Sequence, residues 1–447
     1  MDGNKAVTQP QCIVTNSHVC SILTRMRAYL PALFAALGLL LSTCSKEDQR
    51  VEIEFWTLQL SPTFDSYFHS LIKEYEGSHP AIKIKWVDIP YDVASQKLLA
   101  SVASGSAPDL VNLSGDFLAS FAHKNALAEI STLVQQDTLR MFFPHALEIC
   151  RQGGKLVALP WYLNTYVLMY NTELLRQAGM GERDVPRTFS ELVAFARRYK
   201  EKTGRFGLFW NIGKDSYLPI MLESEGVPMI DAEMTRALFD GSRSVALISQ
   251  WVDLYRQGFL QRESIVNPGS AIIEAYQSGQ VAMVLTGPVF LNRVKVNAPA
   301  IFRRTDIAPS PVGSTSRQEL AAMVLSVMSS SDHPKEAAEF AMFVLDARNQ
   351  IAFSKFTTTY PSVVRALSDP YFTVNDGTLE SKARIVGAST LPVAEQLSGY
   401  KKHPEYFRLH EMFCEAVQSA CLGRMSTKEA LANAAREWNA ILQKKNH

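Results

Sequence analysis

The sequence predicts an α/β protein of two lobes with a cleft between them, and three observations support this fold class. The chain of 447 residues is too long for one hydrophobic core of ordinary size, so two domains are expected and a third is allowed. Strand and helix patterns alternate three times between residues 51 and 124. A similar alternation returns after residue 171, which indicates a second sheet covered by helices.

The first alternation begins where residues 51–56 alternate apolar and polar side chains, as in a strand with one buried face. The expected elements that follow are a helix at 63–75, a strand at 82–87, a helix at 91–104, a strand at 109–113 and a helix at 117–124. Ligands of such sheets lie beyond the carboxyl ends of the strands. We therefore expect binding groups within residues 56–61 and 112–116.

The second alternation is less regular. Its expected strands are 207–210, 281–285 and 320–328, with residues 307–311 returning through prolines, and its expected helices are 172–178, 186–192 onward, 244–257, 270–278 and 335–346. The tail from 404 to 443 has mostly helical spacing. Two similar lobes joined by few crossings imply a cleft between them.

The segment from Gly153 to Asn171 is the predicted first crossing between the lobes. Two apolar runs, 156–159 and 166–170, flank an aromatic pair and a polar pair, Asn164-Thr165. We expect residues 156–160 to end one lobe and residues 167–171 to start the other, which would put the residues between them on the cleft floor. The simpler alternative is two buried strands with an ordinary turn.

Charge and composition exclude some classes of partner. The 45 basic and 44 acidic residues give a formal net charge of +1, so no basic field for nucleic acid is present. With 47% hydrophobic and 20% charged residues, the chain has the composition of a globular protein.

The N-terminus reads as a targeting segment. The apolar run from Leu30 to Leu41 is too short to span a bilayer but suits the core of a signal peptide. Cys44 directly after it resembles the lipidation site of a bacterial lipoprotein, although Thr43 departs from the usual small residue there. On this hypothesis residues 26–43 are the signal peptide and residues 1–25 are an extension or a misassigned start. A plain signal peptide is the alternative.

The exported part retains Cys150, Cys414 and Cys421. An odd number argues against a disulfide framework, and the last two are roughly 10 Å apart if they share a helix face. No His, Cys and Asp cluster has metal-ligand spacing, and no nucleophile motif or P-loop is present, so we expect no cofactor and no metal. A pair of carboxylates acting on a glycosidic bond stays open.

Five stretches together resemble the extracellular solute-binding proteins (family 1) of ABC importers, in the class of maltodextrin- and other sugar-binding proteins. They are SGSAPDLVNLSGDFLASFAHKNALAEI (104–130), GKLVALP continuing to YNTELLRQAG (154–179), PRTFSELVAFARRY (186–199), AYQSGQVAMVLTGP (275–288) and HPKEAAEFAMFVL (333–345). They occur in the family's order over essentially all of residues 51–447.

The resemblance implies a periplasmic-binding-protein fold of type II, whose two lobes close on a ligand by hinge motion. It also implies that each lobe is assembled from separate segments. The N-terminal lobe would comprise residues 51–161 and 315–346, and the C-terminal lobe residues 162–314 and 347–447.

A sugar site needs aromatic faces and planar polar groups. The candidate aromatic residues are Trp161, Tyr162, Trp210 and Tyr217, and the candidate polar residues are Asp116 and Asn164. Strand ends and turns add Thr57, Gln59, Asn211, Gly287, Pro288 and Arg317. Asp116 falls where the family has a sugar-contacting carboxylate, but it also suits a helix cap, and Trp210 also suits a core.

The chain departs from the maltodextrin pattern at three positions. Asn164 stands where maltodextrin binders carry a carboxylate, and Val289 and Leu113 replace aromatic residues. These changes argue against maltose and favour a smaller or less carbohydrate-like ligand.

The leading hypothesis is a monomeric, lipid-anchored binding subunit on the periplasmic face of a bacterial membrane, which delivers a sugar-like solute to an ABC permease. It predicts no enzymatic activity. A second hypothesis of the same class is binding of glycerol-3-phosphate or a glycerophosphodiester, with Lys214 and Arg317 as candidate phosphate contacts. Hypotheses of other classes are an exported polysaccharide hydrolase and a surface adhesin or receptor subunit.

Overall fold

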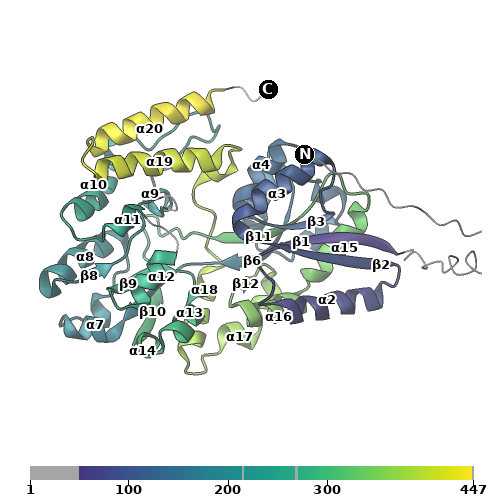
Figure 1. Ribbon diagram of the computed structural model, residues 1–447, viewed down its shortest axis with the longest axis horizontal. Coiled ribbons are helices and arrows are strands. Elements are labelled where there is room, and N and C mark those ends of the chain that lie inside the picture. Colours follow the sequence, from purple (N-terminus) through teal and green to yellow (C-terminus); the bar gives the residue numbers. More distant parts are fainter. Residues whose placement is uncertain (1–49, 214–215, 267–269, 445–447) are drawn as a thin grey trace, which may run out of the picture. The chain divides into compact units, whose positions relative to one another are not determined.

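The computed structural model describes residues 50–213, 216–266 and 270–444, which form two main sheets and a small hairpin (Figure 1). The first sheet packs in one hydrophobic core, and the strands of the second sheet contribute to two clusters, the larger of which is the second core. The expected α/β fold of two lobes is confirmed. No helix within the described ranges is both long and apolar enough to cross a membrane. Cys150, Cys414 and Cys421 are buried, and no disulfide joins them.

The first sheet has six strands in the order β12-β6-β11-β3-β1-β2. They are β1 (Val51–Leu58), β2 (Ile82–Ile89), β3 (Leu110–Ser114), β6 (Leu159–Asn164), β11 (Ala321–Val327) and β12 (Tyr360–Pro361). The strand-helix alternation makes β1 parallel to β2 and β3, with Val51 opposite Ile82. β11 is antiparallel to β3 and β6, because the chain reaches it from the second sheet without a crossover helix.

Amphipathic helices cover this sheet and form the first core. They are α2 (Asp65–Ser78), α3 (Tyr91–Ser104), α4 (Leu118–His123), α6 (Pro144–Ile149), α15 (Pro334–Val344) and α16 (Ala347–Thr357). Shorter pieces are η1 (Gly115–Phe117), η2 (Ile130–Thr132), α5 (Gln136–Leu139) and a hairpin of β4 (Arg151–Gln152) and β5 (Lys155–Leu156). Gly153 and Gly154 turn this hairpin at φ of 55° and 82°, which explains the glycine pair.

The second sheet has four strands in the order β10-β7-β9-β8. They are β7 (Val167–Asn171), β8 (Phe206–Leu208), β9 (Val281–Thr286) and β10 (Thr305–Pro309). Its helices are α7 (Thr172–Gln177), α8 (Phe189–Thr203), α9 (Leu218–Ser224), α10 (Ser242–Arg256), α11 (Glu263–Val266), α12 (Ser270–Gln277), α13 (Phe290–Asn297) and α14 (Pro299–Phe302). The short η3 (Glu182–Asp184) precedes α8. β9 is parallel to β8, so the carboxyl ends of both strands lie at the same edge.

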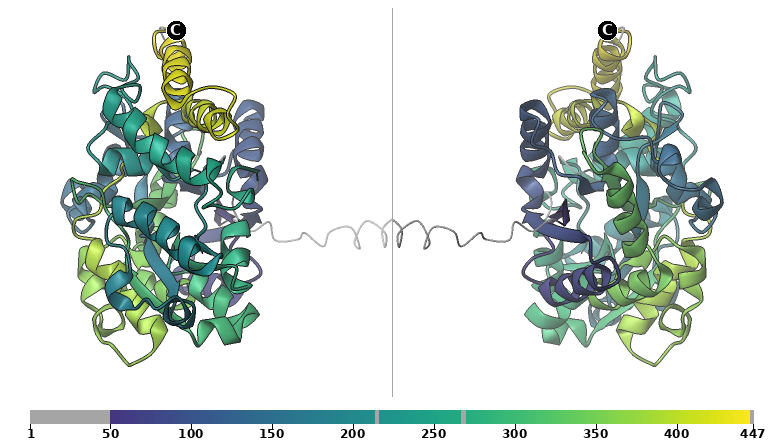
Figure 2. Two further views of the ribbon diagram at one scale, coloured as in Figure 1. Left: turned by 90° about the vertical axis from the view of Figure 1, so that its left-hand side faces the viewer. Right: turned by 90° about the vertical axis from the view of Figure 1, so that its right-hand side faces the viewer.

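The helical tail joins the second core. α19 (Tyr406–Cys421) and α20 (Thr427–Leu442) lie side by side, as the two views of Figure 2 show in yellow. The connection to them contains η4 (Val364–Ser368), α17 (Pro370–Thr373), α18 (Leu379–Thr390) and η5 (Gly399–Lys402). Tyr400 of η5 already packs in the second core, whereas Ala394 still belongs to the first.

The chain crosses between the sheets later than expected. β6 stays in the first sheet through Asn164, and β7 begins the second sheet at Val167, so the first crossing consists of Thr165 and Tyr166. The expected lobe boundaries also need correction at residue 347. β12 pairs with β6, and Phe353 of α16 packs in the first core, so these segments belong with the first lobe and not with the second.

Candidate functional site

A cavity of about 320 Å³ opens at the carboxyl ends of β8 and β9. It is lined by Tyr166, Phe209, Trp210, Asn211, Tyr217, Ile272, Ile273, Leu285, Thr286, Gly287 and Phe290. Four of these, Trp210, Asn211, Tyr217 and Gly287, were expected from the sequence. An apolar, aromatic wall with few polar groups is the usual lining of a small-molecule site, and its position at strand ends is the usual one in α/β proteins.

Tyrosines form the accessible aromatic wall. The rings of Tyr166 and Tyr217 are half-buried and meet edge to face, with centroids 5.0 Å apart at 71°. Phe290 is 38% exposed and lies at the start of α13. Neither Tyr166 nor Phe290 was expected from the sequence. Two sequence features could have identified them: Tyr166 lies in the crossing between the sheets, and Phe290 follows the Gly-Pro turn after β9.

Trp210 has a different role from the one expected. Its ring stacks on Trp251 with centroids 4.2 Å apart at 15°, and its side chain is only 2% exposed. Tyr217 meets it edge on at 5.8 Å. Trp210 therefore supports the wall from behind and offers no open face to a sugar ring.

Trp161 and Tyr162 do not line the cavity. Trp161 is fully buried and stacks on Phe353 in the first core, with centroids 5.0 Å apart. Tyr162 is half-buried and packs against the same two rings. The expectation that they form the cleft floor is wrong for Trp161, because β6 continues through it as an ordinary strand of the first sheet.

At the end of β1, Thr57 is committed to the protein interior. It is fully buried, and its Oγ1 donates to Asp88 Oδ1 at 2.6 Å and accepts from Trp86 Nε1 at 2.7 Å. Thr57 is thus not a ligand contact here. Gln59 is exposed with φ of 53°, and Asn164 is half-buried opposite Ala321 of β11. Both stay predictions.

Pro288 lines a separate cavity of about 430 Å³ on the other side of the same turn. Phe64 and the end of α16 contribute to it from the first core, and α13 from the second sheet's side. Gly287 borders the aromatic cavity and Pro288 this one, so the Gly-Pro turn separates two hollows.

Asp116 belongs to an ion cluster around the buried Lys401. Lys401 Nζ lies 3.1 Å from Asp116 Oδ1 and 3.0 Å from Glu319 Oε1, and Glu319 Oε2 accepts from the backbone N–H of Leu397 at 2.7 Å. Asp116 lies in η1 directly after β3, Glu319 precedes β11 and Lys401 lies on η5. Ser114 caps η1, because its hydroxyl accepts a hydrogen bond from the Asp116 N–H. The Asp116 carboxylate does not cap this helix.

The cluster is electrostatically tied to the tyrosine wall. Burial raises the pKa of Tyr217 well above its usual range; Tyr166 and Glu319 raise it further, and Lys401 opposes them. Burial raises the pKa of Glu319 to about 7, because the attraction of Lys401 only partly offsets the loss of water. Asp116 and Glu319 hold the pKa of Lys401 well above its usual range against the effect of burial. Lys401 therefore stays charged beside the wall.

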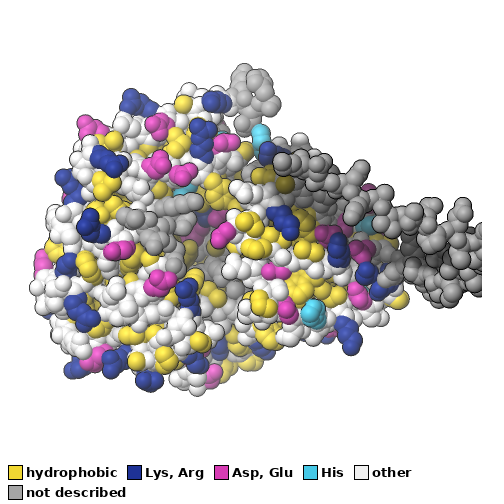
Figure 3. Space-filling model, viewed as in Figure 1, with side chains coloured by type: hydrophobic (Ala, Val, Ile, Leu, Met, Phe, Trp, Pro, Cys, Tyr) yellow, Lys and Arg dark blue, Asp and Glu magenta, His cyan; other side chains and the backbone are white. Residues whose placement is uncertain are grey.

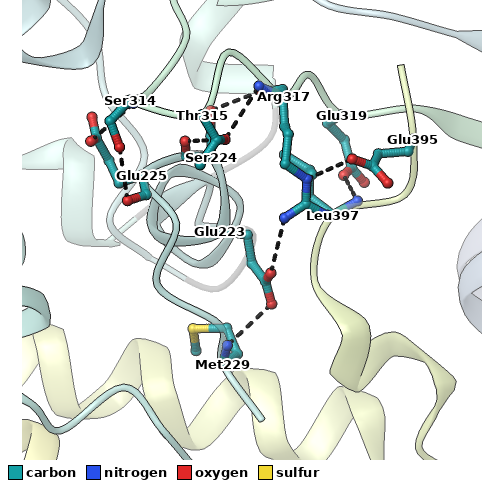
Figure 4. Close-up of polar contacts among 10 residues, drawn as sticks. All are labelled: Glu223, Ser224, Glu225, Met229, Ser314, Thr315, Arg317, Glu319, Glu395 and Leu397. Atoms are coloured by element: carbon teal, nitrogen blue, oxygen red, sulfur yellow. Dashed lines mark hydrogen bonds and ion pairs between the residues drawn. The ribbon is translucent and has the colours of Figure 1, made fainter. Parts of the chain in front are cut away.

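Arg317 links three segments, and its charge is balanced by two carboxylates (Figure 4). Its role as a ligand contact stays a prediction. Its Nε donates to Glu395 Oε1 at 2.5 Å, and its Nη1 lies 3.9 Å from Glu223 Oε2. Glu223 in turn accepts from the Met229 N–H at 3.1 Å. Burial raises the pKa of Glu223, and the Glu395 hydrogen bond raises that of Arg317. The two other candidates, Lys214 and Cys44, lie outside the described residues.

Charges elsewhere show no preference for one sign. Figure 3 shows Lys and Arg side chains interspersed with Asp and Glu over the face in view, in line with the net charge of +1. Within the described ranges, no group of three His, Cys, Asp or Glu side chains is arranged to hold a metal ion.

Two sheets with separate cores, joined by crossings beside an aromatic cavity, define a two-lobed ligand-binding protein. The model of the bacterial extracellular solute-binding protein family matches residues 61–351, and the chain belongs to that family. The expected family is thus confirmed, and with it a location outside the cytoplasm.

Relatives agree with this assignment. The chain is 26% identical over 357 residues, 77% of its length and 78% of the relative's, to the "Uncharacterized lipoprotein in oleD 5′ region" of Streptomyces antibioticus. It is 22% identical over 422 residues, 90% and 94% of the two lengths, to the galactooligosaccharide-binding protein of Bacillus subtilis. A solved periplasmic-binding protein of Synechococcus sp. MITs9220, provisionally assigned to oligosaccharides, matches with a TM-score of 0.81, 32% identity and coverage of 88% of this chain and all of that one.

Proposed function

We propose that this protein binds an uncharged sugar, short oligosaccharide or polyol in the tyrosine-walled cavity and delivers it to the permease of an ABC importer without altering it chemically. The observation that carries the proposal is the half-buried pair Tyr166 and Tyr217 at the carboxyl ends of β8 and β9. Tyrosine offers an apolar face to the C–H side of a sugar ring and a hydroxyl to its oxygens.

Relatives support a carbohydrate or polyol. A galactooligosaccharide-binding protein matches 90% of this chain. Proteins named for maltotriose, arabinooligosaccharide and mannitol match between 31% and 40% of it. The volume of about 320 Å³ is at the low end for ligand pockets, which favours one or two sugar rings or a polyol. This agrees with the smaller ligand expected from Asn164, Val289 and Leu113.

A phosphorylated ligand is less well supported. Of the two cations considered for it, Arg317 is engaged by Glu395 and Glu223. Lys401, the cation beside the tyrosine wall, is already paired with Asp116 and Glu319 and so offers a phosphate no unpaired positive charge. We therefore prefer the uncharged ligand over glycerol-3-phosphate. No specific observation favours a hydrolase or an adhesin.

We further propose that the mature chain is a monomer held at the membrane by a lipid on Cys44. The lipid anchor is supported by the signal-peptide-like segment before Cys44 and by the Streptomyces relative named as a lipoprotein. Delivery would then take place at the membrane surface, with the binding protein tethered near its permease.

Thermal shift and titration calorimetry on residues 45–447 test the proposed ligand class. The panel is maltotriose, a galactooligosaccharide, an arabinooligosaccharide, mannitol and glycerol-3-phosphate. At least one uncharged member should stabilise the protein, and Tyr166→Ala should weaken that binding about tenfold or more. Tyr255→Ala, a half-buried tyrosine of α10 that does not line the cavity, is the matched control. Stabilisation by glycerol-3-phosphate alone would overturn the proposal.

A further inference from the structure

Lys401 is buried where the two lobes meet and forms ion pairs with two carboxylates. Its side chain is 9% exposed, and its ammonium contacts Asp116 at 3.1 Å and Glu319 at 3.0 Å. A lysine is buried this deeply only when charged partners replace its lost water. Asp116 and Glu319 both stabilise the ammonium charge, and Glu319 is the more deeply buried of the two, with its side chain 1% exposed and its second oxygen held by the Leu397 N–H.

Asp116 differs from Glu319 because one of its carboxylate oxygens is available to a ligand. Its side chain is 34% exposed. Its Oδ1 contacts Lys401, whereas Oδ2 has no protein partner among the described residues. A carboxylate with one oxygen fixed and the other open is held in a single orientation, and it can accept a hydroxyl hydrogen without first losing rotational freedom.

The neighbours of Lys401 point in the same direction. Ala321 of β11 pairs with Asn164 of the antiparallel β6, so Glu319 and Tyr166 lie just beyond the same end of this strand pair. Tyr166 lines the cavity, and the charge interactions of Lys401 with Tyr166 and Tyr217 agree with this placement. The cluster therefore stands beside the tyrosine wall and comes from different chain segments than the wall does. Asp116 follows a strand of the first sheet, whereas Tyr217 precedes α9 of the second lobe.

Resting on the proposed function, we infer that Lys401 is a positioning residue of the ligand site: its ammonium fixes the Asp116 carboxylate so that Oδ2 accepts a hydrogen bond from a ligand hydroxyl. Glu319 is the counter-ion that keeps Lys401 in place, and it makes no contact with ligand. The acceptor for the sugar thus depends on a residue 285 positions away in the chain, on the last segment that connects the lobes.

A double-mutant cycle tests the inference with the uncharged panel member that gives the largest thermal shift. Lys401→Met should weaken its binding about tenfold or more in the unmodified protein, and should add little in an Asp116→Asn background, because the two changes remove the same interaction. Lys402→Met is the matched control, since Lys402 neighbours Lys401 on η5 but pairs with Glu148 instead. Additive effects of Lys401→Met and Asp116→Asn would overturn the inference.

Loss of stability needs separate treatment, because Lys401→Met leaves Glu319 buried without its counter-ion. The combination Lys401→Met with Glu319→Gln removes that charge. It should recover melting temperature relative to Lys401→Met alone, while its affinity stays low. Recovery of affinity together with stability would show a merely structural role and overturn the inference.

Crystal structures of the unliganded variants provide a readout that does not depend on identifying the ligand. In Lys401→Met with Glu319→Gln, the Asp116 carboxylate should leave its present orientation, and in Lys402→Met it should keep it. An unchanged Asp116 in the first variant would overturn the inference. Failure of every panel sugar to bind would count against the proposed function and leave this structural test in force.

Discussion

The ring of Tyr217 meets the ring of Tyr166 edge to face, 5.0 Å between centroids, directly at the point where the chain first passes from one sheet to the other. Tyr166 is the second residue of that crossing, and Tyr217 precedes α9. The first crossing and the cavity wall therefore share the side chain of Tyr166.

This contact predicts how Tyr217 variants behave. Tyr217→Ala removes the ring and should weaken sugar binding about tenfold or more, because an aromatic wall residue contributes much of the affinity of a small pocket. Tyr217→Phe keeps the ring and should cost less, by the loss of one hydroxyl contact. Calorimetry with the best-binding sugar measures both. Equal losses for the two variants would mean that the ring face is not what the ligand uses.

Gly387 of α18 packs so closely beside the first crossing that any side chain there is predicted to destabilise the fold. A Cβ at this position would lie 2.0 Å from the Tyr360 hydroxyl oxygen and 2.9 Å from Thr165 Oγ1. Gly387→Ala should therefore destabilise the fold by about 1–3 kcal/mol through overpacking. Adding Tyr360→Phe removes the clashing oxygen and should recover part of the loss in urea unfolding. A fully stable Gly387→Ala would contradict the close packing of α18 on the crossing.

Glu319 predicts a pH dependence of stability. Its pKa is raised by burial from 4.5 to about 7, so the folded state binds a proton that the unfolded state has released between those pH values. The stability that Glu319 contributes is full below pH 4.5, declines as pH rises to about 7 and is flat above it. Melting temperatures across this range should fall less steeply in Glu319→Gln. Glu415→Gln, an exposed acid of α19, should keep the wild-type slope.

Trp161→Ala is predicted to lower the stability of the protein while leaving its affinity for sugar nearly unchanged. Trp161 is fully buried against Phe353, so Trp161→Ala should cost about 3–5 kcal/mol of unfolding free energy. Sugar affinity, measured below the lowered melting temperature, should change by less than about threefold, because the ring does not line the cavity. A large loss of affinity in a folded variant would restore Trp161 to the site.

Cys44 is predicted to hold the protein at the membrane. In a bacterial host expressing the chain from Met26, Cys44→Ala should move it from the membrane fraction to the soluble extracytoplasmic fraction. Labelling with an alkyne fatty acid should be lost at the same time. Labelling that persists in Cys44→Ala would assign the lipid elsewhere.

Several features of this protein followed from local sequence pattern. Alternating side chains in residues 51–56 and 82–87 and the helical spacing between them led to β1, α2 and β2, because local periodicity reports which face is buried. The short apolar run before Thr286 led to β9, and with it to Gly287 and the edge where the cavity opens. Trp210, Asn211 and Tyr217 were found in the same way, as residues after a strand.

Other features depended on contacts between distant segments. Whether Trp161 faces a ligand or a core is decided by Phe353, 192 residues later, and whether Trp210 offers its face is decided by Trp251. Nothing near Asp116 in the sequence points to Lys401, since a buried ion pair needs charges brought together by folding. Sequence pattern thus determined most strands of the two main sheets, the helices that follow the first three strands, and two of the five aromatic residues that line the cavity, Trp210 and Tyr217. The resemblance of five stretches indicated the family. Tertiary structure alone decided which aromatic rings remain open and which cation holds the carboxylate, because both depend on what packs against each side chain from elsewhere in the chain.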